Sequence, residues 1–219
     1  METTSTINGE HFYVEGTLPP PHLWKVAIIG SRTSTGYGES LASTLARDLT
    51  ATGLVAVVSG MAYGIDIAAH RGARGGAVDL GLHPGIAVMA RGLDAVYPSV
   101  HDGFARDMLD AGGCWVSRFP PGTVPTRSNF LARNVDLVTI ADAVVVVEGG
   151  TRSGTINTVT TALRSEVPVF AYPGPVTSAV SYVPNQLIAD RQAMALTGHS
   201  DVGTILRRLT AQYPWHLES

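Results

Sequence analysis

The chain has 219 residues, a length that fits one large domain or two small ones. Hydrophobic residues make up 45% of it and charged residues only 15%, and this composition excludes intrinsic disorder. The formal net charge is −3, so a nucleic-acid-binding function requires that basic residues be concentrated locally. Because Cys114 is the only cysteine, an internal disulfide and a cysteine-based zinc site are both excluded.

The N-terminal residues 1–10 are polar, and we expect them to be flexible. They have neither the basic segment nor the apolar segment of a signal peptide, and no apolar run approaches the ~18 residues that would span a membrane. We therefore expect a cytoplasmic protein with no membrane association. The folded domain is expected to cover residues 11–210, followed by a C-terminal tail at 211–219.

Short apolar runs alternate with helical patterns along most of the chain. His11–Gly16 is expected to be a short edge strand, and the irregular part is expected at Gly75–Pro84. The other expected strands are Lys25–Gly30, Leu54–Gly60, Gly85–Ala90, Cys114–Ser117, Ala143–Glu148, Val167–Tyr172 and Met194–Thr197. The expected helices are Glu39–Thr52, Ile65–Arg74, Gly103–Ala111, Asn129–Ala141, Thr155–Glu166 and Asp201–Leu209. This alternation predicts one α/β domain with a mainly parallel sheet and helices on both faces.

The residues that follow four of the expected strands are rich in Gly, Ser, Thr and Arg. Ligands of such a sheet bind beyond the carboxyl ends of its strands. Small residues expose backbone N–H groups, helix N-termini attract anions, and arginine donates to phosphate oxygens. Each glycine is equally compatible with an ordinary turn. The candidates for phosphate binding in these segments are Gly30, Ser31, Arg32, Ser59, Gly60, Ser153, Gly154 and Thr155. We expect Gly30–Arg32 and the N-terminus of the helix after Ser153 to face one anion-binding cavity.

Several chemistries are disfavoured. The segment Gly30–Gly38 is neither a dinucleotide-binding fingerprint nor a P-loop, and no cofactor is expected. The histidines have no metal-ligand spacing, so no metal site is expected. Asp66 and His70 are four residues apart on one helix face, which is compatible with general-base catalysis. We favour instead a local hydrogen bond between them that fixes the loop Ser59–Gly64.

A basic segment lies at Ala111–Val135, which contains Arg118, Arg127 and Arg133 but no acidic residue. Arginines that contact phosphates beside an aromatic ring that stacks on a base are typical of single-stranded nucleic-acid binding. Phe130 is the candidate ring, and its alternative is a core aromatic. The alternative for each arginine is a solvated surface charge.

The order of short motifs in this chain resembles the DNA-processing protein A family, DprA or Smf. The resemblance extends from His11 to Leu206. The matching segments are Val26–Arg32 (VAIIGSR), Ser59–His70 (SGMAYGIDIAAH), Gly92–Pro98 (GLDAVYP), Phe119–Gly122 (FPPG), Asn129–Asn134 (NFLARN), Val147–Glu148, Ser153–Gly154 and Pro173–Gly174.

The resemblance implies an extended Rossmann-like domain that binds single-stranded DNA and forms a homodimer. It also implies protection of incoming strands in natural transformation and loading of a RecA-type recombinase, without enzymatic activity. Carried over residue by residue, the DNA contacts are Arg32, Arg127 and Phe130, with Arg133 as a helper. Asn129, in the same motif, is a further candidate for DNA binding.

Departures from the family pattern indicate a divergent branch. Asp136 stands in place of a basic residue of the family, which we expect to weaken phosphate binding. Thr126 stands where a second basic residue is common. The family's N-terminal helical domain and C-terminal winged helix have no counterpart in this sequence, so we expect a stand-alone core.

The alternative function is that of a nucleotide-binding or nucleotide-cleaving protein similar to the nucleoside-monophosphate phosphoribohydrolases. The segment Glu148–Thr155 (EGGTRSGT) resembles their Pro-Gly-Gly-x-Gly-Thr-x-x-Glu motif. The catalytic glutamate of that motif is missing, because Asn157, Thr158 and Val159 follow the threonine region instead.

Overall fold

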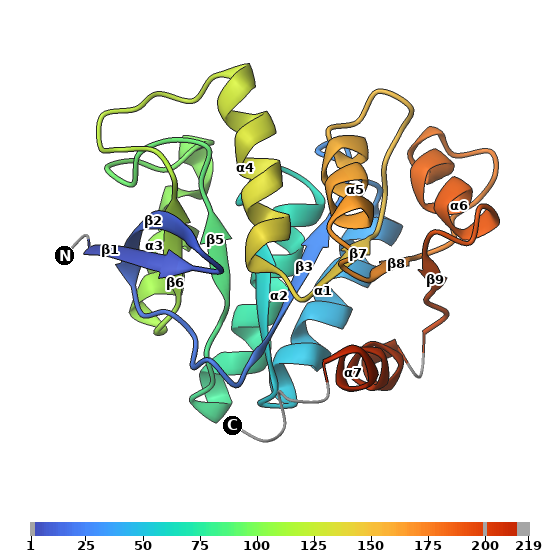
Figure 1. Cartoon of the computed structure of the whole chain (residues 1–219), viewed down its shortest axis with the longest axis horizontal. Helices are drawn as coiled ribbons and strands as arrows, with labels where there is room; N and C mark the ends of the chain where they lie inside the picture. Colours follow the sequence, from blue (N-terminus) through green and yellow to red (C-terminus); the bar gives the residue numbers. More distant parts are fainter. Residues whose placement is uncertain (1–2, 199–200, 214–219) are drawn as a thin grey trace.

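The structure is a computed structural model that describes residues 3–198 and 201–213. The described residues form one nine-stranded sheet with helices against both faces (Figure 1). The strands are β1 (Thr3–Ile7), β2 (Glu10–Gly16), β3 (Trp24–Ile29), β4 (Val55–Ser59), β5 (Ile86–Val88), β6 (Cys114–Ser117), β7 (Ala143–Val146), β8 (Val169–Ala171) and β9 (Met194–Ala195). The helices are α1 (Gly36–Ala51), α2 (Ile65–Ala77), α3 (Asp102–Asp110), α4 (Arg127–Ile140), α5 (Thr155–Arg164), α6 (Tyr182–Ala189) and α7 (Asp201–Gln212).

The strand order is β1-β2-β6-β5-β4-β3-β7-β8-β9. Strands β6 to β9 in this order are parallel, and β2 and β1 add antiparallel to the β6 edge. The chain builds outward from β3 through β4, β5 and β6, and then returns to add β7 on the other side of β3. The direction of winding therefore reverses between β3 and β7, and such a switch point is where α/β sheets bind ligands.

The central strands are continuous apolar runs in the sequence because both faces of the sheet are covered by helices. In β3, Val26 and Ile28 pack in the cluster formed with α1, α2 and α7. Ala27 and Ile29 point the other way, into the cluster formed with α4, α5 and α6. The mainly parallel sheet and its two helical layers confirm the predicted fold class.

The structure differs from the expected elements in five places. Thr3–Ile7, expected to be flexible, forms β1, which pairs with β2, so that β2 is an inner strand rather than an edge. Helix α2 continues to Ala77 into the expected irregular segment, and α6 had no counterpart among the expected helices. Helix α4 begins at Arg127, which places that arginine in its first turn. Helix α7 ends at Gln212, and the rest of the expected tail from residue 214 lies outside the described residues.

Helices α1 and α2 pack closely because small residues line their contact. A Cβ atom added to Gly72 would overlap the carbonyl oxygen of Ser43 on α1. Gly75, one turn further along α2, is exposed and would meet no atom within 4 Å. No helix in the described ranges has both the length and the apolar character to cross a bilayer.

These two glycines give a matched test of the packing. Gly72→Ala should destabilise the fold by about 1–3 kcal/mol, because overpacking exceeds the gain of about 1 kcal/mol in helix propensity. Gly75→Ala should stabilise it by about 0.5–1 kcal/mol. Urea unfolding of both variants measures this, and equal effects of the two changes would contradict the described α1–α2 contact.

Candidate functional site

A cleft of about 1260 Å³ opens beyond the carboxyl ends of β3 and β7, at the switch point of the sheet. One wall consists of the segment after β3 and the first turns of α4. The opposite wall consists of the loop 150–154 and the start of α5. Nine of the residues proposed from the sequence line it, namely Gly30, Ser31, Arg32, Arg127, Phe130, Arg133, Ser153, Gly154 and Thr155. The two segments expected to share an anion cavity therefore do line one cleft, whereas anion binding there stays a prediction.

Three proposed residues do not line the cleft. Ser59 is buried, and its hydroxyl donates to the Ile28 carbonyl oxygen at 2.7 Å. Gly60 lies against the Arg133 guanidinium, which leaves no room for a Cβ. The Asn129 amide Nδ2 donates to the Val124 carbonyl oxygen at 3.2 Å, so this side chain closes the loop that enters α4. All three residues shape the cleft from behind.

Phe130 forms the aromatic element of the cleft. Its ring is half-buried and lines the cavity, so it is neither a core residue nor a free surface ring. The Cζ atom of Arg32 lies 4.3 Å from the ring centroid, within the range of a cation–π contact. The Tyr97 ring lies beside it, with centroids 5.7 Å apart and planes tilted by 59°.

Arg133 is buried beneath this ring, contrary to the expectation that it reaches phosphates. Its side chain is 4% exposed, and Nη1 donates to Asp66 Oδ2 at 3.3 Å. A guanidinium without a partner at this depth would cost several kcal/mol, and the carboxylate offsets that cost. Arg133 thereby supports Phe130 from below and joins α4 to α2.

The expected hydrogen bond between Asp66 and His70 is not formed, because Asp66 binds Arg133 instead. Neither ring nitrogen of His70 makes a hydrogen bond of ordinary geometry, although the Ser59 backbone lies close enough to favour the protonated ring. His70 is fully buried, and desolvation lowers its pKa to about 4, with Asp66 opposing the shift. A neutral, buried imidazole of this kind is a packing residue, and it does not line the cleft.

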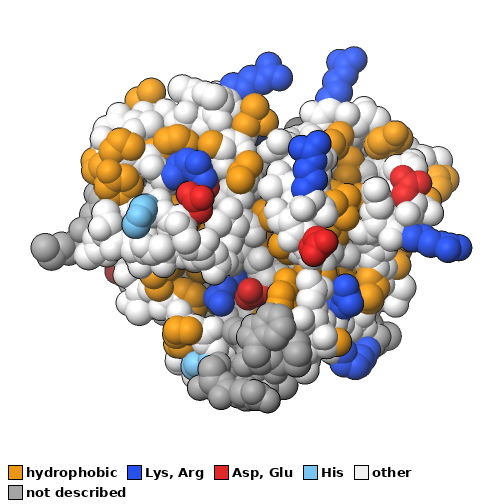
Figure 2. All heavy atoms as spheres, viewed as in Figure 1, with side chains coloured by type: hydrophobic (Ala, Val, Ile, Leu, Met, Phe, Trp, Pro, Cys, Tyr) orange, Lys and Arg blue, Asp and Glu red, His pale blue; other side chains and the backbone are white. Residues whose placement is uncertain are grey.

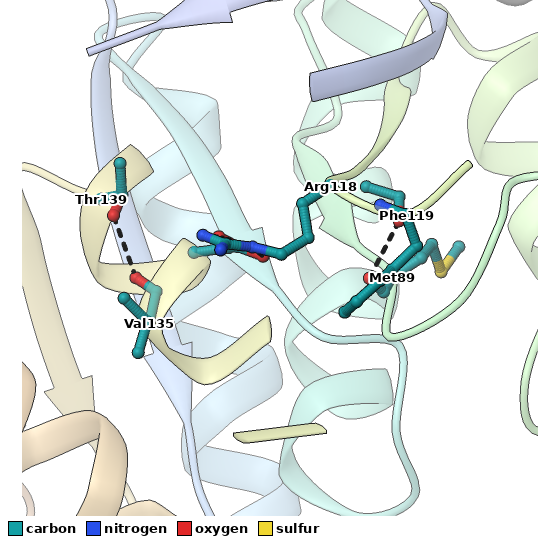
Figure 3. Close-up of polar contacts among 7 residues, drawn as sticks. Met89, Arg118, Phe119, Val135 and Thr139 are labelled. Carbon is teal, nitrogen blue, oxygen red and sulfur yellow. Dashed lines mark hydrogen bonds and ion pairs between the residues drawn. The ribbon is translucent and has the colours of Figure 1, made fainter. Parts of the chain in front are cut away.

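A second ion pair fixes α4 to the end of β6. Arg118 Nε donates to both carboxylate oxygens of Asp136, at 2.8 and 2.9 Å, and the Asp136 side chain is fully buried. Figure 3 shows Arg118 extending from the end of β6 toward the helix that carries Val135 and Thr139. Burial raises the pKa of Asp136, and Arg118 opposes that shift. Asp136 does not line the cleft and its carboxylate is paired with Arg118, so its effect on phosphate binding stays a prediction.

The rim of the cleft carries three exposed arginines, Arg32, Arg127 and Arg152. None of them pairs with an acid among the described residues. In Figure 2 basic side chains project at the top of the molecule, on both sides of the gap between α4 and α5. The sequence prediction missed Arg152. A signal that could have found it is its position in the segment Glu148–Thr155, which follows β7 and lies across the cleft from the segment after β3.

The loop that bears Arg32 is held by a buried carboxylate. Glu148, at the end of β7, accepts hydrogen bonds from the Thr35 backbone N–H at 2.9 Å and from its hydroxyl at 2.5 Å. The same hydroxyl accepts from the Gly38 N–H at 3.2 Å and so caps α1. Glu148 is 3% exposed. It connects the two sides of the switch point and is not available as a catalytic acid.

A phosphoribohydrolase-like reaction finds little support in this geometry. Among the described residues that line the cleft, Asp66 is the only acid, and it is paired with Arg133. Asn157 and Thr158 lie in the cleft where that chemistry needs a carboxylate, and Val159 is buried. An amide and a hydroxyl do not act as a general acid or base near neutral pH.

A sequence model of the family DNA recombination-mediator protein A matches residues 6–207. The chain belongs to this family. It is 44% identical over 155 residues to a putative DNA processing protein DprA of Mycobacterium tuberculosis, over 71% of this chain and 38% of that protein. It is 37% identical over 177 residues to protein Smf of Escherichia coli, over 80% of this chain and 46% of that protein.

The DprA-like fold is also evident among solved structures. DNA processing protein A of Helicobacter pylori, described as having a unique single-stranded DNA binding mode, superposes with a TM-score of 0.78 at 27% identity. The match covers 91% of this chain and 88% of that one. The chain spans less than half the length of the M. tuberculosis and E. coli relatives.

The buried His70 gives a prediction about pH. Its pKa is lower in the folded protein, about 4, than the ordinary 6.5, so the unfolded state binds more protons between these values. Stability from this residue is therefore complete above pH 6.5 and is lost as pH falls toward 4. The loss should be about 2 kcal/mol at pH 5. Urea unfolding at pH 7.5 and pH 5 should show a smaller difference for His70→Gln than for the unmodified protein, and an equal difference would contradict the assignment.

Proposed function

We propose that the cleft binds single-stranded DNA, with one base stacked on Phe130 and backbone phosphates held by Arg32, Arg127 and Arg152. The observation that carries this proposal is the half-buried Phe130 ring in contact with Arg32, in a cleft that Arg127 and Arg152 also line. Arginines that track a backbone, together with a ring that stacks on bases, are the usual means of binding single strands. An acidic protein gains such a site only by local concentration of charge, as seen at this rim.

Family membership supports a proposal about the biological role. We propose that the protein protects single-stranded DNA and helps to load a RecA-type recombinase on it during DNA uptake or recombination. We further propose that it acts as a homodimer, that it is not an enzyme, and that its work takes place in the cytoplasm, where its DNA and recombinase partners are found. The family match over residues 6–207 and the solved relative described as binding single-stranded DNA support these proposals.

Salt dependence tests the electrostatic part of the site. With three free arginines at ~0.7 released counterions per phosphate, the plot of log K against log salt should have a slope of magnitude about 2. Arg127→Ala should lower affinity and reduce this slope by roughly 0.7. Arg207→Ala, on α7 away from the cleft, is the matched control and should leave it unchanged. A slope near zero, with tight binding of free nucleotides, would instead favour the nucleotide-binding alternative.

Phe130 should behave differently from the arginines. Phe130→Ala should cost about 1–3 kcal/mol of single-stranded DNA affinity, because stacking is lost, while the salt slope stays the same. Titration of a labelled oligonucleotide measures both quantities. Since Phe130 is half-buried, its truncation should cost less than the ~3–5 kcal/mol typical of a core phenylalanine. A variant that melts far below the unmodified protein yet binds DNA normally would make Phe130 a core residue.

A further inference from the structure

The wall of the cleft around Tyr97 carries an unusual number of exposed apolar side chains. Tyr97 is 46% exposed and Tyr63 is 51% exposed. Leu131, which lines the same cleft, is 47% exposed. Contiguous exposed apolar surface in a folded protein marks a binding surface more often than chance. The arginine and Phe130 contacts described above leave this surface unused.

Tyr97 continues the aromatic surface of the cleft beyond Phe130. The two rings are 5.7 Å apart between centroids and tilted by 59°, so Tyr97 packs against Phe130 while nearly half of it faces solvent. The loop that carries Tyr97 is tied to the loop before α4. The Gly92 N–H donates to the Thr123 carbonyl oxygen at 3.1 Å, and Asp94 Oδ1 accepts from the Gly122 N–H at 2.9 Å.

Tyr63 does not line the cleft itself and is linked to the Tyr97 wall through His101. The Tyr63 ring meets the buried His101 ring edge-on, with centroids 5.2 Å apart and planes at 64°. His101 Nδ1 bonds to the Met61 carbonyl oxygen at 2.8 Å, and the His101 N–H donates to Pro98. His101 thus joins the loop of Tyr63 to the turn that begins at Tyr97. Ala62, which precedes Tyr63 in the chain, lines the cleft.

The backbone here is held in a conformation that needs support. Met61 is fully buried and has a φ of +58°, a left-handed conformation that costs a non-glycine residue free energy. The bond from His101 to its carbonyl oxygen is one of the contacts that maintain this conformation. The backbone that carries both tyrosines is therefore held by hydrogen bonds between loops, which lowers the conformational entropy lost when a ligand stacks on them.

We propose that Tyr97 and Tyr63 are stacking positions for the two nucleobases that follow the base on Phe130, so that the cleft binds a run of three bases. This proposal rests on the proposed binding of single-stranded DNA. Its occupant is a nucleobase because Tyr97 continues directly from the Phe130 ring, in the cleft whose rim carries the arginines proposed to bind phosphates. Tyrosine accepts any base face, so this track gives affinity and length dependence without sequence specificity.

The test measures binding of labelled oligothymidylates of increasing length to single variants. Tyr97→Ala and Tyr63→Ala should each weaken binding of a long oligomer by at least about fivefold, with the salt slope unchanged, because stacking and not charge is removed. Tyr97→Phe and Tyr63→Phe should bind like the unmodified protein. Tyr182→Ala is the matched control, since Tyr182 is equally exposed at 51% but lines the groove between α5 and α6 instead of the cleft.

The length series adds a second measurement. For the unmodified protein, affinity should rise steeply up to the oligomer that reaches all three rings. In the double variant of Tyr63 and Tyr97 to alanine, this rise should end at the Phe130 position. Tyr97→Leu keeps apolar bulk without a ring, and it should weaken binding as Tyr97→Ala does. A leucine variant that binds normally would overturn the stacking role in favour of general apolar contact.

Each outcome separates the two proposals. If the unmodified protein and its tyrosine variants bind equally well while Phe130→Ala binds weakly, the three-base track is wrong and the proposed function stands. If the unmodified protein does not bind single-stranded DNA at all, the proposed function fails and this inference fails with it. If the tyrosine variants bind DNA normally but lose self-association, the surface is a protein interface and the track is wrong.

Discussion

The reversal of winding direction between β3 and β7 is the constraint on which the rest of the molecule depends. Because β7 pairs with β3 and not with β6, the loops that leave these two neighbouring strands diverge to opposite faces of the sheet. The space between them cannot be filled by either helical layer. Everything that we assign to function lies in or beside this space, including Arg32 after β3 and Arg152 after β7.

An open switch point requires internal support, and three buried charged groups provide it. Glu148 holds the loop after β3, Asp66 neutralises Arg133 beneath Phe130, and Asp136 binds Arg118 at the other end of α4. Arg133 and Asp136 would be costly to bury alone, and their ion-pair partners offset that cost, whereas Glu148 is compensated by two hydrogen bonds from Thr35. The acids near the cleft are thereby occupied internally, so the free charges at its rim are all positive.

The sequence was sufficient for the sheet and its two helical layers, because buried parallel strands and amphipathic helices leave strong local patterns. Strand β1 was missed because Thr3–Ile7 is polar, and the local signal beside it was overlooked. Asn8 and Gly9, both with positive φ, form the two-residue turn that pairs β1 with β2. Helix α6 was missed because a proline lies inside its short apolar segment. At α6, unlike β1, the tertiary contacts outweigh local preference.

The site was predicted in outline but not in the roles of its charged residues. Strand-end reasoning placed Arg32 and Ser153 in one cleft from composition, and the family resemblance added Phe130 to Arg32. The sequence analysis treated every arginine as a free hydrogen-bond donor. The binding of Arg133 by Asp66, and of Arg118 by Asp136, was not predictable from it. Ion pairs between residues 67 or 18 positions apart leave no periodic signal, so the difference between a buried and a free arginine emerges only from packing.

The late arrival of β7 also has a consequence for synthesis of the chain on the ribosome. Val26 of β3 pairs with Ala143 of β7, a partner 117 positions later. At a translation rate of about 5–20 residues per second, one edge of β3 stays unpaired for roughly 6–23 s before β7 has been synthesised. That edge belongs to a run of β-branched residues with little charge, the kind of strand that pairs readily with foreign chains. The topology that creates the cleft thus exposes the nascent protein to aggregation, and expression at a lower temperature or with a holdase chaperone should favour the native fold.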